Sequence, residues 1–224
     1  MLGSDWGFAG TQPQQGQHNV NLRETMGENY LITDGFVEAV SSFETLSDSL
    51  KQIPFDPYRW KWAILAMHSG LQGMMILALQ GSHGLHVLKK EDAKRWLDAH
   101  ENGGPYPTDL QLDGFLSLYK KIKGELMIMY VDSKKFTPKG TEGDSIKFLN
   151  RLRNEYVHFT PRVWAFELVG LPDIFMDCQN IAEFLAWQSG NVFWRESSLK
   201  KRIKNAFSLS RSSLLKLREK YENG

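Results

Sequence analysis

Residues 147–161 gather side chains that transfer protons and bind phosphate. Histidine titrates near neutral pH, and the guanidinium of arginine stays charged with a planar fork that matches phosphate oxygens. At about 100° per residue on a helix, the apolar residues of this segment fall on one stripe, the predicted core face: Leu149, Leu152, Tyr156 and Phe159. Four polar residues fall on the opposite edge: Lys147, Arg151, Asn154 and His158. The pattern predicts a helix with one buried face and one cationic, imidazole-bearing edge. A plain solvated face is the alternative interpretation.

The run Arg153-Asn154-Glu155-Tyr156-Val157-His158 resembles the Arg-Asn-x-x-x-His signature of the HEPN superfamily. These are small α-helical domains of prokaryotic toxins, defence systems and CRISPR effectors, and the resemblance covers about residues 35–189. It implies metal-independent RNA cleavage by a homodimer. His158 is then the general acid/base, Arg153 the phosphate clamp and Asn154 an orienting hydrogen-bond group. The expected products are a 2′,3′-cyclic phosphate and a 5′-hydroxyl.

The spacing of Arg153 and His158 constrains how they meet one phosphate. Five residues on a straight helix place them about 140° apart around the axis. Either the helix distorts before Pro161, or two subunits present their motifs across a twofold axis and build a composite site. The second arrangement is the one that the resemblance implies.

The resemblance leaves the regulation and the activity open. In HEPN toxins controlled by a nucleotidyltransferase antitoxin, a tyrosine commonly stands two residues after the motif histidine, where this chain has Thr160. Some HEPN domains keep the fold for binding alone. The leading hypothesis is therefore a toxin or antiphage-defence endoribonuclease, with an antitoxin or a larger defence complex as a possible partner. The alternative is a catalytically silent interaction subunit of a larger assembly.

Charge is distributed unevenly along the chain. The 224 residues carry a net charge of +1, but residues 195–224 hold nine Lys/Arg against three Glu, a local +6, so the remainder carries −5. This asymmetry favours an anionic partner near the C-terminus. We predict RNA contacts from Lys147, Arg151 and a cluster in the C-terminal basic helix, with a solubilising face as the alternative for that helix. The cluster comprises Lys200, Lys201 and Arg202.

Composition and spacing argue against several other classes. With 42% hydrophobic residues, 24% charged residues and one cysteine, the chain is neither disordered throughout nor a disulfide scaffold. His83 and His86 lack the spacing of a metal site, and no glycine-rich phosphate loop joins a strand to a helix, so no metal and no cofactor are expected. His68 is expected to be a hydrogen-bonded core histidine. Gly70 and Gly73 are expected to let helices approach closely.

Hydrophobic periodicity predicts an all-α, up-and-down, HEPN-like bundle. We expect helices over residues 34–50, 58–80, 91–99, 110–130, 144–158, 172–188 and 197–221. The organisation is a flexible N-terminal arm (1–33), the bundle (34–190) and a basic C-terminal helix (191–224). The uncharged run 62–79 is interpreted as a buried core helix rather than a membrane span. With no signal-peptide pattern in residues 1–30, we expect a soluble, cytoplasmic protein.

Overall fold

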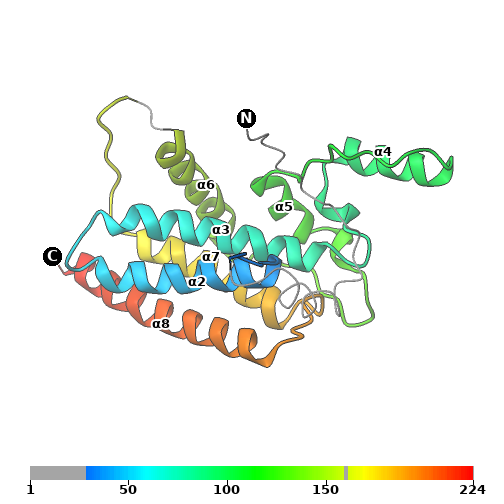
Figure 1. Cartoon of the computed structure of the whole chain (residues 1–224). Helices are drawn as coiled ribbons and strands as arrows, with labels where there is room; N and C mark the ends of the chain where they lie inside the picture. The colour runs from blue at the N-terminus through cyan, green and yellow to red at the C-terminus, as the bar shows by residue number, and fades with distance from the viewer. Residues whose placement is uncertain (1–28, 159–160, 224) are drawn as a thin grey trace. The chain divides into compact units, whose positions relative to one another are not determined.

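The computed structural model describes residues 29–158 and 161–223 (Figure 1). The chain divides into two compact units, Met1–Asp34 and Gly35–Gly224. Of the predicted N-terminal arm, residues 1–28 lie outside the described residues, and residues 29–34 form no helix. The second unit contains seven α-helices among the described residues: α2 (Gly35–Gln52), α3 (Arg59–Leu79), α4 (Lys90–Glu101), α5 (Phe115–Ile122), α6 (Glu142–His158), α7 (Leu171–Trp187) and α8 (Ser197–Glu222).

The all-α fold class is confirmed. In the described part of the chain there are no strands, and one isolated antiparallel bridge joins Leu88 to Leu112. Two short 3₁₀ helices, Leu85–Val87 and Glu125–Met127, complete the second unit. The start of α7 shows how the sequence sets an element boundary. Gly170 adopts a left-handed φ of 78°, and Pro172 follows in the first helical turn, where its missing N–H costs nothing.

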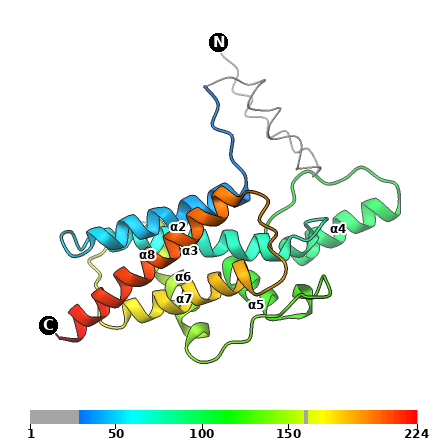
Figure 2. The same cartoon turned by 90° about the horizontal axis from the view of Figure 1, so that it is seen from below.

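Four helices form a closed ring around the core. Helix α2 packs on α3, α3 on α7, α7 on α8, and α8 returns to α2. Figure 2 shows α8, in orange and red, running between α2 and α7. Edge-to-face rings cross these interfaces at Phe43–Phe207 and Trp60–Phe175, with centroids 4.7 and 5.1 Å apart. Helix α8 is thus part of the ring rather than an appendage to it.

The close approach of α2 and α3 depends on the two predicted glycines. A Cβ atom on Gly70 would lie 2.9 Å from the ring of Phe43, and one on Gly73 would lie 3.1 Å from the Cβ of Ala39. Both predictions are confirmed. Helix α3 is also the helix that packs on most others, since α5, α6, α2 and α7 all contact it.

Helix α3 is the one helix in the described ranges that is long and apolar enough to cross a membrane. In its most apolar window, 67% is buried inside the protein. Full burial extends to its central residues Ile64, Met67 and Leu71. This burial is compatible with the soluble protein expected from the sequence.

The predicted helix over residues 110–130 is too long. Only Phe115–Ile122 is α-helical, because the preceding segment instead pairs with residues 87–89: the N–H of Asp113 donates to the carbonyl of Val87 at 2.8 Å. Gly114 and Gly124 are both extended and bound the helix at its two ends. The apolar spacing was misleading because Leu112, 49% exposed, continues the period without entering the core.

A polar junction fixes the loop after α5 against the segment after α7. The side-chain amide of Asn191 donates to the carbonyls of Ala78 and Met127 at 3.0 and 2.8 Å, and its Oδ1 accepts from the hydroxyl of Ser133 at 2.5 Å. Gly190, at φ 75°, packs so closely that a Cβ atom there would lie 2.5 Å from the carbonyl oxygen of Asp132.

Candidate active site

Helix α6 is anchored to α7 at its N-terminal end, and its C-terminal turns contact the segment that follows, where Arg162 pairs with Glu155 at 2.7 Å. The Glu142 carboxylate accepts hydrogen bonds from the backbone N–H groups of Lys139 and Gly140, which lie just before the helix. The hydroxyls of Thr141 and Ser145 both donate to Asp177 of α7, at 2.7 and 2.6 Å. In Figure 1 the last turns of α6 stand away from the ring.

Burial along α6 follows this anchoring. Ile146, Leu149 and Leu152 are fully buried against α3 and α7, as the predicted core stripe requires. Tyr156 is half-buried, with its ring edge-on to Trp164 at 4.9 Å, and Phe159 lies outside the described residues. The helix becomes exposed at Val157, so its final turn projects beyond the packed interface.

The motif residues lie in these last two turns. Arg153 is half-buried, and its Nη1 donates to Oδ1 of Asn154 at 3.0 Å. Within residues 29–158 and 161–223, no carboxylate forms an ion pair with Arg153. His158 is the exposed last residue of α6 and has no hydrogen-bond partner in the described part of the chain. A guanidinium oriented by an amide and an accessible imidazole are therefore both available to a ligand.

The helix is regular α-helix as far as His158. Arg153 and His158 therefore keep the separation of about 140° that five residues impose. Within the described residues, no distortion turns the two side chains of one chain toward a common point. Of the two arrangements considered from the sequence, a helix that distorts before Pro161 is not seen as far as His158.

The predicted polar edge of α6 is divided among separate contacts. Lys147 forms an ion pair with Asp144, one turn earlier, at 3.0 Å. The guanidinium of Arg151 lies over the ring of Phe148 at 4.7 Å. Among the predicted catalytic residues, and within the described ranges, only Arg153 and Asn154 are joined by a hydrogen bond.

His68 of α3, which was predicted to be a core histidine, lies close to the motif. Its side chain is 5% exposed and stacks on Phe115 with centroids 3.9 Å apart, while Nε2 lies 3.2 Å from Oδ1 of Asn150. The prediction of a hydrogen-bonded core histidine is confirmed. Burial lowers the pKa of His68 to about 4; the Asn150 hydrogen bond opposes this shift, and the charge of Arg153 adds to it. Asn150 is thus a neighbour of the candidate site that the spacing of residues along α6 did not identify.

The cations of α8 divide by residue type. Its arginines bind carboxylates of neighbouring helices: Arg202 with Glu44 at 2.7 Å, Arg211 with Glu183 at 3.0 Å, and Arg218 with Asp173 at 3.2 Å. The bond from Arg202 lowers the pKa of Glu44.

The lysines of α8 form no ion pairs within the described residues. Lys200 and Lys204 lie over Trp187 at 6.0 and 5.4 Å, and Lys201 is exposed. Of the three predicted RNA contacts on α8, Arg202 is already occupied by a protein carboxylate, whereas Lys200 and Lys201 are not.

Other reactive groups offer less. In the described ranges no three His, Cys, Asp or Glu side chains are grouped so as to hold a metal ion. Cys178 is fully buried, and burial raises the pKa of its thiol, so it is a packing residue rather than a nucleophile. Comparison with family models, curated proteins and solved structures finds no match.

Proposed function

We propose that this protein is a metal-independent endoribonuclease of the HEPN type, acting as the effector of a toxin or antiphage-defence module. One observation carries the proposal: the C-terminal end of α6 presents Arg153, held by Asn154, together with an exposed His158. A cation for phosphate and an imidazole for proton transfer are the two groups that RNA cleavage through the 2′-hydroxyl requires.

The reaction follows from these groups. His158 accepts the proton of the 2′-hydroxyl as its oxygen attacks the adjacent phosphorus. The bond from phosphorus to the 5′-oxygen breaks, the proton taken up by His158 is delivered to the 5′-oxygen, which leaves as a hydroxyl, and a 2′,3′-cyclic phosphate remains. Arg153 stabilises the charge that develops on the phosphorane oxygens, and Asn154 orients the guanidinium through the bond at 3.0 Å.

The regular geometry of α6 supports a site shared by two chains. Since Arg153 and His158 point about 140° apart on one helix, a single phosphate is best flanked by Arg153 of one protomer and His158 of its partner. The exposed end of α6, including Val157 at 41% exposure, is available for such a contact. Dimerisation is then part of the mechanism.

The test is incubation of the purified protein with total RNA in the presence of EDTA. Cleavage is expected to persist with the chelator and to leave 2′,3′-cyclic phosphate ends. Arg153→Ala and His158→Ala should each reduce the rate by about 10²-fold or more. Arg95→Ala is the matched control, because it removes an exposed arginine of α4 that pairs with Asp92 and Asp109.

Two results would count against the proposal. RNA left intact under all these conditions would favour a catalytically silent interaction subunit. Cleavage that is lost equally in Arg95→Ala and Arg153→Ala would show a general effect of net charge. Unchanged thermal unfolding of each variant verifies that the fold is retained.

A further inference from the structure

The turn between α2 and α3 is rigid. Pro54 and Pro57 restrict its backbone, and the N–H groups of Phe55 and Asp56 both donate to the carbonyl of Gln52 at 3.0 Å. The Asp56 carboxylate accepts from the Tyr58 N–H at 3.0 Å and from Nε of Arg59 at 3.2 Å. The conformation of this turn is therefore set by residues 52–59 and the hydrogen bonds among them.

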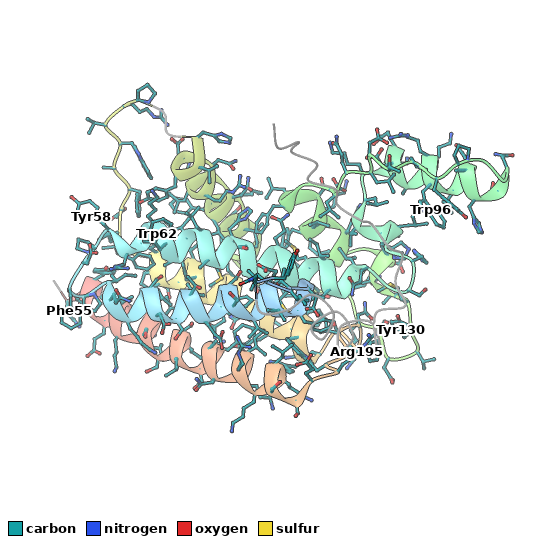
Figure 3. All side chains as sticks on the ribbon, in the orientation of Figure 1. Phe55, Tyr58, Trp62, Trp96, Tyr130 and Arg195 are labelled. Carbon is teal, nitrogen blue, oxygen red and sulfur yellow. The ribbon has the colours of Figure 1, made fainter. Side chains whose placement is uncertain are left out.

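This rigid turn holds two aromatic rings in solvent. Phe55 is 89% exposed and Tyr58 is 85% exposed, and both lie at one end of the bundle (Figure 3). Because these rings stay in water, the folded chain lacks the stabilisation that burial of an aromatic side chain provides. Pre-ordered, solvated rings are the arrangement on which nucleic-acid bases stack.

A cationic groove lies directly beside the turn. It has a volume of about 250 Å³ and is formed by the end of α2, Pro54 and the last turns of α8. Leu50, Pro54 and Leu217 give it an apolar floor, and three lysines surround it: Lys51, Lys216 and Lys220. None of its lining residues is acidic, and none belongs to α6.

Two of the lysines have an alternative explanation. Lys51 and Lys220 stand in the last turns of their helices, where cations offset the helix dipole. Lys51 also lies 3.4 Å from Asp48. This explanation does not extend to Lys216, which lies before the last turn, nor to the exposed rings of Phe55 and Tyr58.

We propose that the groove and the turn bind a single strand of RNA, with bases stacked on Phe55 and Tyr58 and phosphates beside Lys51, Lys216 and Lys220. The identification of the strand as RNA rests on the proposed function. The surface is separate from the α6 motif, so it holds the substrate away from the bond that is cut. A membrane is the less suitable partner, because two rings on a short turn insert far less apolar area than an amphipathic helix.

The experiment measures binding of a short fluorescein-labelled single-stranded RNA by anisotropy, with His158→Ala as the parent protein so that the probe stays intact. Adding Phe55→Ala and Tyr58→Ala is expected to weaken binding about tenfold or more, since each stacked base contributes about 1–3 kcal/mol. Adding Lys216→Glu and Lys220→Glu should weaken binding. The slope of log K against log salt concentration should become shallower by about 0.7 for each phosphate contact that is lost.

The matched control is Lys90→Glu with Lys94→Glu. These lysines are exposed and have the same four-residue spacing on α4. Equal effects of the α4 and α8 pairs would overturn the proposal, because they would show only the influence of net charge. Equal affinity for duplex RNA would overturn the stacking role. Loss of binding to phosphatidylserine vesicles in these variants, with RNA binding unchanged, would assign the surface to a membrane.

Failure of this proposal is distinguishable from failure of the proposed function. If the wild-type protein cuts RNA and the groove variants bind as the parent does, the groove proposal is wrong and the catalytic one stands. If the wild-type protein cuts nothing but the groove variants lose RNA binding, the reverse holds.

Discussion

The imidazole Nε2 of His68 lies 3.2 Å from Oδ1 of Asn150 and joins the centre of α3 to the helix that carries the motif. Because an amide oxygen only accepts, the N–H at Nε2 is the donor, and burial, which lowers the pKa of His68 to about 4, keeps the ring neutral near pH 7. Asn150 stands one turn before Arg153 and Asn154 on α6. The contact therefore fixes the height and rotation of α6 just below the end that carries the motif.

Acid should destabilise the fold through His68. The pKa of His68 is about 4 in the folded chain, whereas an unfolded histidine titrates near 6.5. As the pH falls, the unfolded chain binds a proton before the folded chain does. The stabilisation that the neutral His68 contributes is therefore complete above about pH 6.5 and is lost as the pH falls toward 4. We expect about 2 kcal/mol of additional loss between about pH 7 and pH 5.

The measurement is urea unfolding of the wild-type protein and of His68→Gln at both pH values. Glutamine donates a hydrogen bond but does not titrate. The wild-type protein should lose more free energy of unfolding than the variant over this interval, whatever the cost of the substitution at neutral pH. Equal losses would contradict a neutral, buried imidazole at this position.

A composite site predicts complementation between two inactive variants. In a mixed dimer of Arg153→Ala and His158→Ala chains, one of the two sites lacks both groups and the other keeps both. Random exchange of subunits should therefore restore about one quarter of the wild-type activity. The measurement is the RNA cleavage rate before and after mixed refolding, with each variant refolded alone as the control. A site within one chain would give no recovery.

Gly190→Ala should destabilise the protein by about 2–4 kcal/mol, since it combines a left-handed backbone with overpacking. The new Cβ would lie 2.5 Å from the carbonyl of Asp132, which is backbone and has little room to move. Gly170→Ala is the matched control: φ is 78° there, with nothing within 4 Å, so about 1 kcal/mol is expected. Chemical denaturation measures the free energy of unfolding of both variants. Similar losses would mean that contact with the Asp132 loop costs nothing.

The sequence predicts most helices because their signals are local. The apolar run that became α3, the proline at the start of α7 and the alternating apolar and basic residues of α8 each lie within one element. The excess length of the helix predicted over 110–130 has a physical reason. Leu112 and Leu116 continue a helical period although both are more than 40% exposed, and the extended Gly114 and Gly124 were the signals against it.

The candidate site was predictable only in part. Arg153, Asn154 and His158 follow from local order on one helix. The pairing of His68 with Asn150 joins positions 82 residues apart, which hydrophobic periodicity does not relate. The same limit applies to Arg202: its charge suggested RNA, but Glu44, 158 residues away, binds it. Long-range polar pairing decides which cations remain available, and no local pattern encodes it.

The packing of α2 against α8 has a consequence for synthesis of the protein. These helices close the ring, and the bond between Glu44 and Arg202 spans 158 residues of chain. A contact of such high order carries a large loop-closure cost and forms late. On the ribosome, α2 emerges long before α8 and keeps one apolar face uncovered until α8 follows. The core that supports α6 is therefore completed only after α8 has been synthesised.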